Sequence, residues 1–177
     1  MIYLKNFILV MIWFLFGSSK VGLYQNAYNY IKAHYDTQHF YWENSTPYQN
    51  CIKISSEVVP LSMISFFDHF SNDSVSTKKS LEVIDSLETL DKVNYFEPYI
   101  DESLSNIPTC DDNTEAILFF SKPTEKNTLL AILFIGKYPS KSFEEISRFN
   151  EGLLFLLFTK EDSKEIVNSI SSIIRFE

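Results

Sequence analysis

Apolar residues are concentrated in three runs in the last third of the chain. The runs cover residues 116–120, 129–135 and 153–158, and polar segments separate them. Each run is apolar at every position rather than at every second position, which is typical of a strand covered on both faces. The three runs therefore predict strands in the middle of a sheet that helices cover. The expected strands are Glu115–Ser121, Thr128–Gly136 and Leu153–Thr159.

Two further segments are predicted to extend this sheet. In Cys51–Val59, apolar Ile52, Ile54 and Val58 alternate with mostly polar residues, and the following proline ends the strand because it has no N–H to donate. The apolar residues of Lys164–Phe176 fit one face of a helix as well as one face of a strand. The short polar turn before this segment, together with its Ser and Ile content, favours a strand.

Apolar side chains at helical spacing predict the helices. Tyr24, Tyr28, Ile31 and Tyr35 follow one another at intervals of four, three and four, which places four large side chains on one face of a helix. This helix and a second long helix, Thr77–Leu90, each have an apolar face that could cover the sheet. The expected helices are Leu23–Tyr35, a short helix that begins near Leu61 or Ser62, Thr77–Leu90, and a helix that a capping box opens at Ser142 and that runs to Phe149.

A long connection without regular periodicity lies between the second long helix and the apolar runs. It covers Asn94–Asn113 and contains Pro98 and Pro108, and we expect a helical turn around residues 101–107. If the protein has a site, we expect it where the helices and this connection meet the rim of the sheet.

The order of these elements predicts an α+β fold. We expect helices packed on one face of a mostly antiparallel, curved sheet of about four to five strands, preferably a cone-like or cystatin-like roll. The length of 177 residues suits one domain, which we place at residues 20–177.

The first 19 residues are predicted to be a secretory signal peptide. Lys5 supplies the positive charge, residues 7–16 are apolar, and small residues follow, so we expect cleavage after Ser19. The alternative is an uncleaved anchor, although the apolar run is shorter than the roughly 20 residues that span a bilayer. The mature protein is therefore expected to be secreted or periplasmic, with membrane contact only if the segment is an anchor.

Two cysteines occur, Cys51 and Cys110, and a pair of cysteines in an exported chain most simply forms a disulfide. Two separate buried thiols are the alternative. Asn44 and Asn72 begin N-glycosylation sequons, which would be used only in a eukaryotic secretory pathway.

The charge of the chain argues against nucleic acid as a partner. The formal net charge is −8, and Lys78–Lys79 is the only adjacent pair of basic residues. A polyanion binds a clustered basic surface, which this sequence lacks. With only 4 glycines, the chain also lacks a Gly-rich phosphate-binding loop.

The sequence carries no recognisable catalytic motif. There is no Gly-x-Ser-x-Gly, and His34, His39 and His69 do not have the spacing of a metal site, so we expect neither a metal nor a cofactor. Asp111–Glu115 resembles only part of a calcium loop. An alternative function is a small exported hydrolase that uses one of the histidines with a nearby acid.

Aromatic residues near the N-terminus are the strongest candidates for binding. Tyr and Trp are favoured in ligand pockets and at protein interfaces, whereas packing of a helix on a sheet is the alternative role. The function predicted is a non-catalytic binding or interaction domain, with an unknown protein or a small apolar ligand as the partner, or a carrier of small apolar ligands. The candidate binding residues are Tyr24, Tyr28, Tyr35, Phe40, Tyr41 and Trp42.

Overall fold

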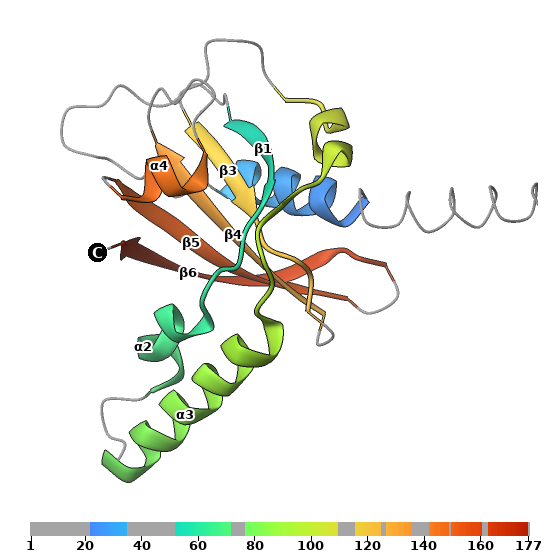
Figure 1. The fold of residues 1–177 in the computed structure, drawn as a ribbon. Helices are drawn as coiled ribbons and strands as arrows, with labels where there is room; N and C mark the ends of the chain where they lie inside the picture. The colour runs from blue at the N-terminus through green and yellow to red at the C-terminus, as the bar shows by residue number, and fades with distance from the viewer. Residues whose placement is uncertain are drawn as a thin grey trace, which may run out of the picture.

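The computed structural model describes residues 22–34, 52–71, 77–109, 116–124, 127–135, 142–148, 150–160 and 163–176. Within these ranges, six strands form one sheet with helices around it (Figure 1). In chain order, the strands are β1 (Ile52–Val58), β2 (Tyr99–Ile100), β3 (Ala116–Phe120), β4 (Thr128–Ile135), β5 (Glu151–Thr159) and β6 (Ile166–Arg175). The helical elements are an N-terminal helix over residues 22–34, η1 (Met63–Phe66), α2 (Phe67–Phe70), α3 (Thr77–Asn94), η2 (Glu102–Asn106) and α4 (Phe143–Ser147).

The sheet has the order β2-β1-β3-β4-β5-β6 and combines two kinds of pairing. Strands β3 to β6 form an antiparallel meander, whereas β1 lies parallel to β3. Because parallel neighbours require a long crossover, η1, α2, α3, β2 and η2 all lie in the connection between β1 and β3. The α+β class is confirmed. Four of the five pairings in the described sheet are antiparallel, and the pairing of β1 with β3 is parallel. The sheet has one strand more than the four to five expected, because the two-residue β2 has no periodic pattern from which it could be recognised.

Side chains of the central strands alternate between two separate cores. Along β3, Leu118 belongs to the core on one face and Phe119 to the core on the other, and both are completely buried. The N-terminal helix covers the first face, whereas η1 and α4 contribute to the second. The prediction of helices on one face only is therefore wrong. Strands that are apolar at every position need cover on both sides, and the structure supplies it.

The N-terminal helix packs on the sheet with the predicted face. Tyr24, Tyr28 and Ile31 are buried, and the two tyrosine hydroxyls reach the strands beneath. Tyr24 Oη donates to the carbonyl oxygen of Ser121 at 3.2 Å, and Tyr28 Oη donates to that of Ile52 at 3.4 Å. These bonds satisfy hydroxyls that would otherwise be buried without partners.

On the opposite face, α4 begins at the predicted capping box. Ser142 Oγ accepts from the Glu145 N–H, and the Glu145 carboxylate accepts from the Ser142 N–H. The cap fixes the start of the helix so that Ile146 is fully buried and Phe143 packs edge-to-face on Phe119, with ring centroids 5.4 Å apart.

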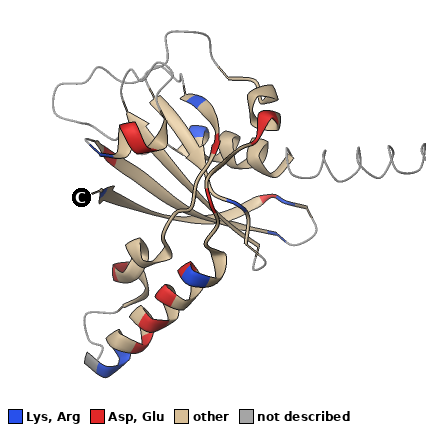
Figure 2. Cartoon of the chain, viewed as in Figure 1, with Lys and Arg blue, Asp and Glu red and all other residues tan. Residues whose placement is uncertain are grey.

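The amphipathic sequence of α3 led us to expect a helix that lies flat on the sheet, and the structure shows a different arrangement. It packs mainly on η1 and α2 and extends away from the sheet (Figure 1). Leu87 is buried, whereas Leu81, on the same predicted face, is 56% exposed. Figure 2 shows charged residues along this helix, while the interior of the sheet is almost free of charge.

Two predictions about the less regular segments are confirmed. The ambiguous segment Lys164–Phe176 forms β6, which pairs antiparallel with β5. The expected helical turn in the long connection is η2, whose Leu104 is fully buried.

Several predictions concern residues outside the described ranges. These are the signal peptide, the cysteine pair Cys51 and Cys110, the sequons at Asn44 and Asn72, and the acidic segment Asp111–Glu115. None of the helices in the described ranges combines the length and the hydrophobicity needed to cross a lipid bilayer.

Candidate ligand-binding groove

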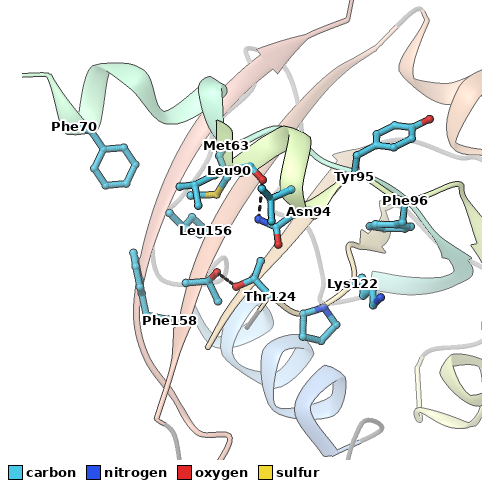
Figure 3. A pocket seen from close by; sticks show the side chains of 13 residues that line it. Met63, Phe70, Leu90, Asn94, Tyr95, Phe96, Lys122, Thr124, Leu156 and Phe158 are labelled. Atoms are coloured by element: carbon cyan, nitrogen blue, oxygen red, sulfur yellow. Dashed lines mark hydrogen bonds between the residues drawn. The ribbon is translucent and has the colours of Figure 1, made fainter. Parts of the chain in front are cut away.

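A groove of about 480 Å³ lies between the C-terminal end of α3 and the sheet (Figure 3). Its walls come from η1, α2, α3 with the residues that follow it, the turn after β3, and strands β4 and β5. The lining residues are Met63, Phe70, Leu90, Val93, Asn94, Tyr95, Phe96, Lys122, Pro123, Thr124, Thr128, Leu156 and Phe158. The volume is within the roughly 300–1,000 Å³ that is usual for small-molecule sites.

One end of the groove is wholly apolar. Phe70 and Phe158 lie there, and Met63 and Leu156 continue the apolar wall toward the middle (Figure 3). Leu156 is completely buried in the second core, whereas Phe70 is 42% exposed. At this end, the buried Leu156 forms the base of the groove, and the partly exposed Phe70 forms its apolar edge.

Polar groups occur in the middle of the groove. The Oγ1 atoms of Thr124 and Thr128 are 2.5 Å apart, so one of the two hydroxyls donates to the other. The Asn94 side-chain N–H₂ donates to the carbonyl oxygen of Leu90 at 2.8 Å. A hydroxyl and a primary amide both carry more than one donor or acceptor position, so groups of these types can orient a ligand.

The other end of the groove is formed by Tyr95, Phe96 and Lys122 (Figure 3). Tyr95 Oη donates to a Glu97 carboxylate oxygen at 3.2 Å, and this hydrogen bond and the negative charge of Glu97 raise the pKa of Tyr95. Lys122 is exposed. In the described part of the chain, the lining contains no Asp or Glu, and Lys122 is its only basic residue.

The position of α3 above the groove is fixed by Asp91. Its carboxylate accepts hydrogen bonds from Ser62 Oγ at 2.5 Å and from the backbone N–H of Met63 at 2.6 Å. A third, from the N–H of Ile64, measures 3.3 Å. These donors lie at the start of η1, so a side chain of α3 caps the N-terminus of η1. Asp91 thereby holds together the two walls of the groove that these helices form.

The two predicted binding residues that the structure describes do not line this groove. Tyr24 and Tyr28 belong to the core beneath the N-terminal helix, with 1% and 4% of their surface exposed. Burial raises the pKa of both hydroxyls, and the charges of Tyr99 and Asp101 raise that of Tyr24 further. Tyr35, Phe40, Tyr41 and Trp42 lie outside the described residues.

The described histidines contact backbone oxygens. His34 Nδ1 lies 2.9 Å from the Tyr30 carbonyl oxygen, and its ring stacks on Tyr30. His69 Nε2 lies 3.0 Å from the Ser171 carbonyl oxygen. Among the described residues, no group of three or more His, Cys, Asp or Glu side chains is arranged to hold a metal ion. His39 lies outside these residues.

Sequence reasoning placed a site near the rim where the helices and Asn94–Asn113 meet the sheet, and the groove lies in that region. It did not identify the lining residues, which come from segments far apart in the chain. The available signal was the apolar spacing of Met63 and Phe70, which the sequence explains equally well as core packing.

No protein-family model, curated protein or solved structure matches this chain. The fold and the groove therefore define the class: an α+β domain with an apolar groove beside a mixed sheet.

Proposed function

We propose that this protein is a non-catalytic binding domain that holds a small apolar molecule in the groove between α3 and the sheet. The observation that carries the proposal is the groove itself, an open volume of about 480 Å³ with a mostly apolar lining. Ligand sites are typically concave and apolar, with a few polar groups that orient the ligand, and Asn94, Thr124 and Thr128 are suited to that role.

The proposal combines two of the functions expected from the sequence, a binding domain and a carrier of small apolar ligands. We also propose that the protein is exported and that its signal peptide is cleaved after Ser19. The partner is the ligand, with no cofactor. A cone-like or cystatin-like roll also stays a prediction, and binding in the groove does not depend on it.

A hydrolase is less well supported. General acid–base catalysis would require a histidine close to a carboxylate or a hydroxyl in a concave site. In the described part of the chain, His34 and His69 both contact backbone carbonyl oxygens, and neither lines the groove.

The proposal is tested by titrating the full chain with N-phenyl-1-naphthylamine, a neutral probe that becomes fluorescent in apolar surroundings. We expect saturable binding to the wild type. Val93 lines the groove and is 77% exposed, so Val93→Asp should fold normally and still place a charge in the site. Because an apolar probe bound in the groove would displace water from this carboxylate, we expect the affinity to fall about fivefold.

The matched control is Leu81→Asp, which introduces the same charge at another exposed aliphatic position of α3, outside the groove. This variant should bind the probe like the wild type. Equal losses in both variants, or no saturable binding to the wild type, would refute the proposal.

A further inference from the structure

We propose that the ligand of the groove is an amphiphile with one hydrocarbon chain and an anionic head group, which Lys122 binds. This inference rests on the proposed function, and it adds the chemical class of the ligand and the direction in which the ligand lies. The hydrocarbon chain extends toward Phe70 and Phe158, and the head group lies beside Lys122.

The charge of the lining is the first argument. The chain carries 23 acids against 15 bases, yet among the residues that the structure describes the groove is lined by one lysine and by no acid. The acids of α3 do not line the groove: Asp91 is bonded to η1, and Glu88 pairs with Lys92. Glu97 accepts from Tyr95 Oη at this end but is not among the described lining residues, so Lys122 is the charged lining group that complements an anion.

The order of the lining residues is the second argument. From one end to the other, the groove passes from Phe70 and Phe158, through the Thr124–Thr128 hydroxyl pair, to Lys122 (Figure 3). An apolar end, a hydroxylated middle and a cationic end match the polarity of a fatty-acid-like molecule along its length. Because Lys carries a long apolar stem, it can pack beside the chain while its ammonium group contacts the head.

The groove measures about 480 Å³, and thirteen of the described residues line it, a size that favours a single chain over a lipid with two chains. Of the lining residues that the structure describes, Lys122 is the one cation, and a lone cation disfavours docking to an anionic membrane surface, which requires a basic cluster. The occupant we infer is therefore a free, single-chain carboxylate.

The test measures displacement of N-phenyl-1-naphthylamine by decanoate, 1-decanol and decylammonium, each below the concentration at which it aggregates. The three competitors share the hydrocarbon chain and differ in the charge of the head. An exposed ion pair contributes little, so we expect decanoate to bind the wild type roughly two- to fivefold more tightly than 1-decanol. Added salt should reduce this preference.

Three variants locate the effect. Lys122→Gln should bind 1-decanol as the wild type does and lose the preference for decanoate. Lys122→Glu should prefer decylammonium, a reversal that a folding defect cannot produce. Lys78→Gln removes the same charge from the first turn of α3, roughly 18 Å along the helix from Leu90, and should keep the wild-type preference.

The outcomes separate the two proposals. If 1-decanol displaces the probe and decanoate has no advantage, or if Lys78→Gln loses the advantage as Lys122→Gln does, the assignment of the head group is wrong while the groove still binds apolar molecules. If the wild type binds neither the probe nor any competitor, the proposed function fails and this inference fails with it.

Discussion

At the scale of single residues, Gly152 in β5 shows how closely neighbouring strands pack. A Cβ atom at this position would lie 2.5 Å from Ile132 Cδ1, 2.8 Å from Ile132 Cγ1 and 3.0 Å from Phe134 Cε1. Ile132 and Phe134 are fully buried in the second core, so moving either side chain away from a new Cβ atom would disturb its packing there. Glycine is needed here because of this close approach.

We expect Gly152→Ala to lower the free energy of unfolding by about 1–3 kcal/mol, the usual cost of overpacking a core. Gly22→Ala is the control, because a Cβ atom there meets nothing within 4 Å. Urea unfolding of both variants and the wild type measures the difference. If Gly152→Ala is as stable as Gly22→Ala, the packing around β5 is looser than described.

The buried hydroxyl of Tyr24 makes stability depend on pH. Burial, Tyr99 and Asp101 raise the pKa of Tyr24 above the value of about 10 for an exposed tyrosine. As the pH rises, the unfolded chain therefore loses this proton before the native state does. The contribution to stability is complete below about pH 10 and is lost as the pH rises further.

Tyr24→Phe should accordingly show a shallower decline in the free energy of unfolding above about pH 10 than the wild type. Below that pH, we expect the variant to be less stable by about 1 kcal/mol, because the hydrogen bond to Ser121 is lost. Tyr28, whose pKa burial also raises, should preserve part of the decline. Parallel pH profiles for the variant and the wild type would contradict this account.

At the scale of elements, the periodicity of α3 predicted a helix correctly but misled about its environment. Leu81 and Leu87 share one face in the sequence pattern, yet only Leu87 is buried. The reason is that Asp91, a polar residue outside the apolar pattern, fixes the helix to η1 through hydrogen bonds to backbone N–H groups. Periodicity reveals which face is apolar, but it does not reveal such a contact between distant segments.

Removing the Asp91 carboxylate should therefore loosen α3. We expect Asp91→Ala to lower the free energy of unfolding by about 1.5–3 kcal/mol, since hydrogen bonds to a charged group are lost and the half-buried N–H of Met63 loses its carboxylate acceptor. Asp85→Ala removes an exposed acid from the same helix and should change stability by no more than about 0.5 kcal/mol. Equal effects on thermal unfolding would show that Asp91 has no special role.

The same contact links stability to the groove. Because Asp91 holds η1 against α3, Asp91→Ala should also weaken binding of N-phenyl-1-naphthylamine, whereas Asp85→Ala should not. A destabilised variant that binds the probe with unchanged affinity would show that the walls of the groove are positioned independently of this bond.

At the scale of the whole molecule, the sequence predicted the strands correctly where every residue of a run is buried. The runs that became β3, β4 and β5 are apolar at every position, and this pattern identified them as central strands. It also required cover on both faces, a consequence that the expectation of helices on one face overlooked. The parallel pairing of β1 with β3 could not be predicted, because pairing depends on the path of the intervening crossover rather than on either strand.

The groove could be located only approximately. Its position near the rim follows from the order of the elements, but its lining combines Met63, Leu90, Lys122 and Leu156, which are brought together by the docking of α3. The aromatic residues that drew attention in the sequence, Tyr24 among them, are core residues where the structure describes them. Large aromatic side chains stabilise cores and form binding sites equally well, so their presence alone does not distinguish the two roles.

The most direct measurement is an NMR titration of the full chain, labelled at its methyl groups, with 1-decanol. If the groove binds apolar ligands, the signals of Met63, Leu90 and Leu156 should shift together and saturate, while those of Ile31 and Leu133, in the core on the opposite face, should stay in place. Saturating shifts confined to the opposite face, or no saturable shifts in the groove, would contradict the proposed function.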